Sequence, residues 1–239
     1  MYSATSKIAS NAATWLATLV IIIIATACKP SNTTDTATHD TSVNTAKSTS
    51  GTDTFRQIDA TGNIHVTYTQ AAEHGYTIEA PQTALKYLKI KVANNKLNIT
   101  SKDAPASLMD SVTIHVTAPM IDEVGLNGSC TFTSHEAINA DDIVLSISGS
   151  GSINLPKSLT CNEIKVEIDG SGSIMFTEVK ATKVKTEIDG SASITYQMLT
   201  ADQASSDING SGRIVLKGNV ASHTENVNGN GTIDTSGLK

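Results

Sequence analysis

One short phrase recurs through the second half of the chain and constrains its fold more than any other feature. The phrase has the form I-x-G-S-G-x-I, and the spacing between its copies shortens slightly along the chain. Its six copies, of which the first is degenerate, begin at Leu126, Ile147, Ile168, Ile188, Ile208 and Val227. A nearly fixed period of about 20 residues is typical of a solenoid, in which each repeat packs only against its neighbours.

Two short strands are predicted in each repeat. Apolar and polar residues alternate before the phrase, as at Ile143, Leu145 and Ile147, and again after it, as at Ile153 and Leu155. Such alternation predicts β-strands, and the two glycines between them allow the positive-φ backbone of a sharp corner. We therefore expect an all-β fold, a single-stranded parallel β-helix of about six coils, each of about 20 residues. Right-handed winding is expected because parallel crossovers are overwhelmingly right-handed.

Residues 55–125 predict an N-terminal β region ahead of the repeats in residues 126–239. The run Ala93–Lys96 contains two asparagines between alternating segments, and asparagine tolerates the left-handed backbone of a tight turn, so a β-hairpin is expected there. Ile58–Val66 echoes the repeated phrase with a single glycine. The region is therefore expected to be an irregular start of the same solenoid, with a cap over its open end.

The N-terminus has the features of a lipoprotein signal peptide over residues 1–27. Lys7 precedes the apolar run Ala12–Ala27, which is short for a membrane-spanning helix. Small residues then lead to Cys28, as in a bacterial lipobox, which predicts cleavage before Cys28 and lipid on its sulfur. Several acyl chains would hold the protein firmly at a bilayer. An ordinary signal peptide and an uncleaved anchor are the alternatives.

The segment that follows is expected to be a disordered tether, residues 28–54. Half of the stretch from Lys29 to Thr54 is Ser or Thr, and little of it is apolar. Such a segment buries too little surface to fold, and as a flexible coil it would span roughly 28 Å. We expect an exported protein anchored to the cell envelope, at the outer membrane, with either face possible because no acidic pair follows Cys28.

The G-S-G-S-I phrases follow a segment that reads F-R-Q-I-D-A-T-G-N-I-H-V from Phe55. Together they resemble the family called putative auto-transporter adhesin, head GIN domain, a bacterial domain of unknown function found in envelope proteins, notably of Bacteroidetes. The resemblance covers Phe55 to about Thr235, and departs from the phrase at Ala192, Arg213 and Asn230. It implies adhesion to a glycan or protein, and it carries no functional residues.

The repeats align five carboxylates in one acidic stripe. Its members lie one position before or after the first apolar residue of successive phrases, and they are Glu167, Asp169, Glu187, Asp189 and Asp207. Like charges at strand spacing repel unless a cation or solvent screens them, and calcium prefers carboxylate oxygens. The stripe is therefore a weak candidate metal site, while Lys165 and Lys185 two positions away favour an ordinary solvated face.

The remaining polar residues suggest no catalytic constellation. Cys130 and Cys161 lie at different phases of adjacent coils and are expected to be free or buried thiols, although an oxidising envelope permits a bridge. His65 and His115 are expected to be outward strand residues, and no histidine spacing is typical of a metal site. Asn209 and Asn228 could stack as an amide ladder. We expect no catalytic residue and no cofactor.

These features together favour a non-enzymatic binding or adhesion module on a lipid anchor, whose ligand is a glycan or protein. The net charge of −6 gives no basic surface for nucleic acid. One alternative is a structural module that stacks end to end through its open coil, which concentration-dependent oligomers would reveal. Another is an enzyme like a polysaccharide lyase, although Arg213 is the only arginine in the repeats.

Overall fold

The computed structural model describes the backbone of residues 44–49 and all atoms of residues 53–239. Residues 40–239 form a compact unit of their own. The predicted signal peptide, residues 1–27, and the predicted lipidation site Cys28 lie outside the described residues. In the described part of the chain, no helix has the length and apolar content to cross a membrane.

The described chain is almost entirely β, as the alternation predicts. Its strands are β1 (Asn44–Thr49), β2 (Gln57–Gly62), β3 (His65–Gln70), β4 (Gly75–Ala80), β5 (Leu88–Ala93), β6 (Lys96–Ser101), β7 (Thr113–Ala118), β8 (Glu123–Gly128), β9 (Thr131–Ser134), β10 (Ile138–Asn139), β11 (Asp142–Gly149), β12 (Ser152–Gly170), β13 (Ser173–Gly190), β14 (Ser193–Gly210), β15 (Arg213–Gly229) and β16 (Thr232–Leu238). The two short helices are η1 (Leu85–Tyr87) and α1 (Ala106–Met109).

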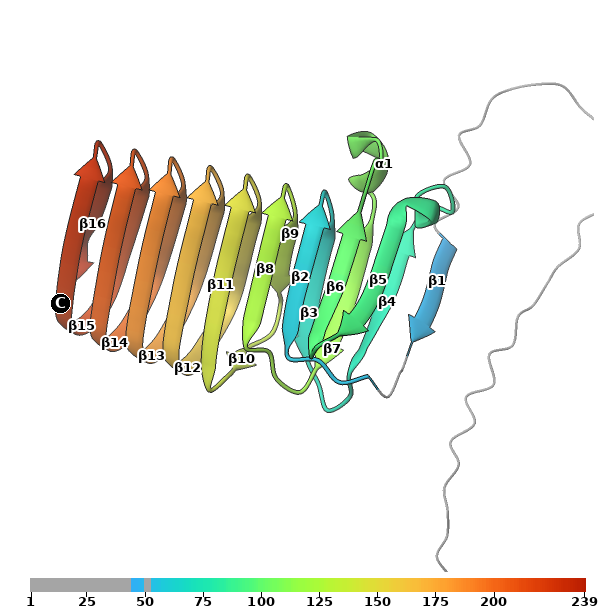
Figure 1. Ribbon diagram of the computed structural model, residues 1–239. Helices are drawn as coiled ribbons and strands as arrows, with labels where there is room; N and C mark the ends of the chain where they lie inside the picture. Colours follow the sequence, from blue (N-terminus) through green and yellow to red (C-terminus); the bar gives the residue numbers. More distant parts are fainter. Residues whose placement is uncertain (1–43, 50–52) are drawn as a thin grey trace, which may run out of the picture. The chain divides into compact units, whose positions relative to one another are not determined.

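These strands stack into a parallel β-solenoid of about six turns, which confirms the predicted fold (Figure 1). Each coil climbs one face, turns at the glycine phrase and returns along the other face. We call face A the one formed by β5, β6, β2, β8, β11 and the later halves of β12–β15. Face B is formed by β1, β4, β7, β3, β9, the first parts of β12–β15, and β16.

Register between coils follows the sequence period. Parallel pairing places Ile147 of β11 beside Ile168 of β12, which lies beside Ile188 of β13. The same column continues through Ile208 of β14 to Val227 of β15. Register shifts absorb the changes of period, the first of them between Leu155 and Ser158. The shortening coils therefore keep every copy of the phrase in line.

The first glycine of the phrase forms a column that no other residue could fill. Gly170 has a φ of 127°, a conformation that side chains disfavour. A Cβ there would lie only 2.5 Å from the carbonyl oxygen of Gly149 in the preceding coil. Both the backbone conformation and the close approach of neighbouring coils require glycine.

The second glycine of the phrase differs from the sequence expectation, because its φ is not positive. At Gly172 the constraint is packing instead, since a Cβ there would lie 2.8 Å from Cγ2 of Ile147 and 2.9 Å from the carbonyl oxygen of Gly151. Ala192 occupies the same position one coil later, is 2 % exposed and has no positive φ. The second position therefore accepts one methyl group, whereas the first does not.

The N-terminal region belongs to the same stack, but chain order and stack order differ there. The coil of β2 and β3 lies between the coil of β6 and β7 on one side and that of β8 and β9 on the other. β5 and β6 form the predicted hairpin, in which Asn94 and Asn95 have φ values of 54° and 63°. The excursion from β4 to β7 is thus inserted beneath the first coil.

Antiparallel strands close the N-terminal end of the stack. β4 pairs with β7 and β5 with β6, both antiparallel, and η1 connects this end layer. β1 adds to the free edge of β4 in antiparallel orientation. The composition of Lys29–Thr54 predicts no folded structure, yet Asn44–Thr49 forms this strand, because backbone pairing on an existing edge requires no apolar side chains.

The core between the two faces is made of columns of inward residues. On face B, Ile153, Ile174, Ile194 and Ile214 pair in register and are at most 2 % exposed. Phe176 and Tyr196 stack with ring centroids 4.6 Å apart. Each coil therefore buries its apolar residues against the coils before and after it.

The core becomes polar towards the last coil of face A. One inward column runs from Val166 through Thr186 and Ser206 to Glu225. His223, in the neighbouring inward column, lies 3.2 Å from the Glu225 carboxylate through Nδ1 and 3.2 Å from the Ser206 hydroxyl through Nε2. Polar side chains thus take positions that are apolar in earlier coils.

Candidate functional site

The predicted acidic stripe is present on face A. Glu167, Glu187 and Asp207 pair in register on successive coils, and Asp169 pairs with Asp189 in the next column. All five side chains are exposed or half-buried. The carboxylates therefore lie one strand spacing apart, about 4.8 Å, on an open surface.

Lysines interleave with the stripe. Lys165 Nζ lies 2.5 Å from the Glu167 carboxylate, and Lys185 Nζ lies 3.5 Å from that of Glu163. Within residues 53–239, no group of three or more His, Cys, Asp or Glu side chains is arranged to hold a metal ion. The lysines offset much of the repulsion, so the geometry is that of a charged, solvated surface.

Face B carries a different chemistry, which sequence inspection did not single out. One outward column consists of hydroxyl residues, Thr131, Ser152, Ser173 and Ser193. The column beside it consists of Thr133, Asn154, Met175 and Thr195. Over these coils the side chains of both columns are uncharged. The serine after the second glycine of the phrase is the sequence signal that could have indicated this face.

The two histidines predicted to point outward, His65 and His115, lie on face B, where each is within hydrogen-bond distance of a threonine hydroxyl. His65 Nδ1 is 2.7 Å from the Thr131 hydroxyl, and His115 Nδ1 is 2.7 Å from the Thr67 hydroxyl. His115 Nε2 is also 3.3 Å from the Glu79 carboxylate. Each histidine links neighbouring strands through a threonine or a carboxylate.

The two cysteines inside the folded unit are free and buried. Burial raises the pKa of Cys130 to about 11 and that of Cys161 to about 12. Both thiols are therefore protonated at neutral pH, and a protonated thiol is neither a nucleophile nor a metal ligand. The prediction of free, buried thiols is confirmed.

Asn209 and Asn228 pair in register on face A, and both are exposed. Register alone satisfies the spacing that an amide ladder needs. The ladder itself stays a prediction.

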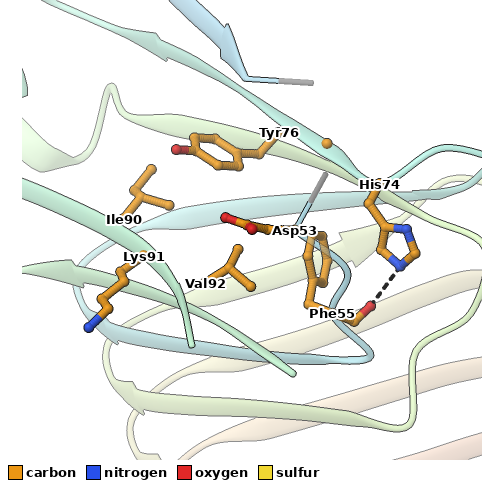
Figure 2. Close-up of a pocket in the computed structure, with 8 residues that line it drawn as sticks. Asp53, Phe55, His74, Tyr76, Ile90, Lys91 and Val92 are labelled. Atoms are coloured by element: carbon orange, nitrogen blue, oxygen red, sulfur yellow. Dashed lines mark hydrogen bonds between the residues drawn. The ribbon is translucent and has the colours of Figure 1, made fainter. Parts of the chain in front are cut away.

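A partly enclosed hollow lies at the N-terminal end of the core, with a volume of about 270 Å³. Figure 2 shows Tyr76 of β4 across the hollow from Ile90 and Val92 of β5, with Asp53 between Tyr76 and Val92 and with Phe55 beside His74. His74 packs edge-on against Phe55, with ring centroids 5.2 Å apart. This hollow is the part of the core that the end layer leaves uncovered.

The geometry defines a class: a β-solenoid with two faces of side chains that repeat from coil to coil. The chain belongs to the family described as putative auto-transporter adhesin, head GIN domain, which matches residues 54–238. The family description places the chain among adhesin-like proteins that are exported or exposed at the cell surface.

Solved structures share the fold. A putative adhesin from Bacteroides fragilis is 20% identical over 81% of this chain and 97% of its own, with a TM-score of 0.66. A putative adhesin from Parabacteroides distasonis is 20% identical over 82% and 97%, with a TM-score of 0.69. A putative lipid binding protein from the same organism is 16% identical over 76% and 92%, with a TM-score of 0.63. No curated protein matches the chain.

Proposed function

We propose that this protein is a lipid-anchored module of the cell envelope that binds an extended glycan or protein without catalysis. Cys28 carries the lipid, and the segment after it tethers the solenoid. The observation that carries the proposal is the register of the coils, which repeats each outward side chain at about 4.8 Å along the stack. A surface with a fixed repeat suits a ligand that also repeats.

Face B is the proposed ligand surface. Its central columns present hydroxyl and amide groups, which donate and accept hydrogen bonds without the desolvation cost of charges. Met175, 46 % exposed, adds an apolar contact. Face A presents carboxylates and lysines, of which Glu167 and Lys165 form an ion pair, and a neutral glycan would have to desolvate these charges to bind there.

Two features of the described coils weigh against the alternatives. Arg213, the arginine that a lyase-like centre would need, is 2.8 Å from the Asp234 carboxylate. Inward positions of the last face A strand hold His223 and the Glu225 carboxylate, and an inward carboxylate discourages edge-to-edge stacking. A non-enzymatic module that does not stack through this edge fits both observations.

The test is binding to immobilised glycans and envelope proteins with one variant for each face. Ser173→Glu with Ser193→Glu adds two charges to face B, and Ser205→Glu with Thr224→Glu adds two to face A at similarly outward positions. We expect the face B variant to lose at least about tenfold in affinity by repelling and desolvating the ligand contact. Equal loss in both variants, or loss only in the face A variant, would reject face B as the ligand surface.

A further inference from the structure

The N-terminal end of the stack is basic in an otherwise acidic protein. Residues 80–102 hold five lysines and no acidic residue, whereas the whole chain has a net charge of −6. Lys89 and Lys91 are exposed at outward positions on β5, the outermost strand of face A. Lys86 is exposed in η1, with its Nζ 4.8 Å from the centre of the Tyr87 ring. The lysines therefore gather on the layer that closes the stack.

Most of this positive charge is not neutralised within the fold. Lys96 is 3.0 Å from the Glu123 carboxylate. For Lys86, Lys89 and Lys91, no carboxylate of residues 53–239 lies within ion-pair distance. Of the acids of this end, Glu79 lies on β4, and the exposed Asp53 lines the hollow beside Lys91 without forming an ion pair with it. The β5 side is left with free cationic groups.

The same end layer exposes apolar and aromatic surface. Its inward side chains are only half-buried because no further coil covers them, and they are Tyr76, Ile78, Leu88, Ile90 and Val92. The hollow of about 270 Å³ opens among them (Figure 2). Cationic side chains beside half-exposed aromatic and aliphatic groups make a surface typical of proteins that lie on a membrane.

Negative charge is unevenly distributed along face A. Asp59 lies two strands from β5 in the column of Lys91, and the five carboxylates of the acidic stripe lie farther away. The first member of the acidic stripe, Glu167, lies on the fifth strand beyond β5 in the stack, in the order β6, β2, β8, β11 and β12. Five strand spacings amount to about 24 Å. This exceeds the screening length of about 8 Å at physiological salt. An anionic surface near β5 would therefore attract the lysines without sensing the stripe.

We propose that this end layer, centred on Lys86, Lys89 and Lys91, docks on the anionic headgroups of a lipid bilayer. The inference rests on the proposed lipid anchor, since β1, which belongs to the segment after Cys28, joins this same layer. Docking would stand the solenoid on its N-terminal end and leave faces A and B free. Lysines on an exposed edge discourage strand pairing, which favours a lipid surface over an extended peptide.

Co-sedimentation with vesicles tests the proposal, using a chain that begins at Lys29 and carries no lipid. This chain contains the whole compact unit, residues 40–239. We expect it to bind vesicles of phosphatidylcholine with 30–40 mole per cent phosphatidylglycerol (roughly the content at which basic proteins respond) and not vesicles of phosphatidylcholine alone. Binding should weaken as salt rises.

The decisive comparison uses two charge reversals. Lys89→Glu with Lys91→Glu should weaken vesicle binding by at least about tenfold, since each lysine near an anionic surface contributes about fivefold. Lys157→Glu with Lys217→Glu is the matched control, because both lysines are exposed, distant in the stack and outside the ion pairs of the described residues. Lys89→Gln with Lys91→Gln removes the two charges without introducing carboxylates. Circular dichroism of each variant checks that it is folded.

Three results would overturn the proposal: no preference for anionic vesicles, equal loss in the control, or equally tight lysine-dependent binding of soluble polyglutamate. The last would identify an acidic polypeptide as the partner. Because the tested chain carries no acyl group, these failures leave the anchor proposal intact. Mass spectrometry that finds Cys28 unmodified would reject the anchor and leave vesicle binding unchanged.

Discussion

At the residue scale, the sequence of the glycine phrase predicts where each coil turns, but the reason for each glycine is visible only in the structure. Turns at every copy follow from the glycines alone. The sequence does not reveal that the two glycines are needed for different reasons. Gly170 has a positive φ, whereas Gly172 is limited by its packing against Ile147, and both positions are simply glycine in the sequence. Only Cys130 in the first copy and Ala192 in the fourth indicated that the second position is less restrictive.

Gly170→Ala should destabilise the fold by about 3–5 kcal/mol, from backbone strain plus collision with the coil beneath. Gly172→Ala should cost less, about 1–2 kcal/mol, because its φ is not positive and the Ile147 side chain can shift, although the Gly151 carbonyl oxygen would also lie 2.9 Å from the added Cβ. Ser171→Ala, in the exposed turn between them, is the control. Urea unfolding gives all three values, and a cost for Gly170→Ala no larger than the control would refute the explanation.

The buried thiols supply a prediction about pH. Cys130 and Cys161 have folded pKa values of about 11 and about 12, raised from 9.0 by burial. A raised pKa means that the protonated thiol is favoured in the folded state, so this stability is complete below pH 9 and lost as pH rises towards 11 and 12. Folded protein should resist a thiol reagent at pH 8 and react after unfolding in urea. Fast reaction of the folded chain at pH 8 would contradict the burial.

At the element scale, local patterns predicted what local contacts determine. The β5–β6 hairpin follows from Asn94-Asn95, and the coils follow from alternation and period. The order of the layers beneath β2 could not be predicted in this way, because it is fixed by pairing between distant parts of the chain. Gln57 of β2, for example, pairs with Lys96 of β6 on one side and with Glu123 of β8 on the other. Strand β1 was likewise missed, because its polar residues pair through the backbone only.

Asn95→Gly should stabilise the hairpin by about 0.5–1 kcal/mol, because glycine adopts the φ of 63° without steric cost. Asn95→Val should destabilise it by about 1–2 kcal/mol, since a β-branched residue is strained there. Thermal unfolding of the two variants measures the difference. Similar midpoints for both would indicate that the hairpin turn is not as described.

At the scale of the whole molecule, the sequence predicted the solenoid and its family, but not the chemistry of its ends and faces. The acidic stripe was visible because its members share a phase in the repeat. The hydroxyl column of face B was missed although its serines also share a phase, because serine beside glycine is common in turns. The polar end of the core was missed because single polar residues replace apolar ones there in the last coils.

His223 and Glu225, the inward polar residues of the last coil, should keep the exposed edge of β15 from pairing with another strand. His223→Leu with Glu225→Leu extends two apolar columns to the edge, and we expect concentration-dependent association in sedimentation velocity. Ser222→Leu with Thr224→Leu adds apolar surface at outward positions of the same strand and serves as the control. A monomer for the first variant at all concentrations would show that these residues do not protect the edge.

Protease accessibility on intact cells tests the central claim of a surface binding module most directly. The full-length protein carries a C-terminal epitope tag, and Cys28→Ser serves as the control for anchoring. We predict that protease removes the tag from intact cells bearing the unaltered chain, and that the Cys28→Ser chain is lost from the membrane fraction. Protection of the tag until the outer membrane is opened would place the solenoid in the periplasm and contradict adhesion.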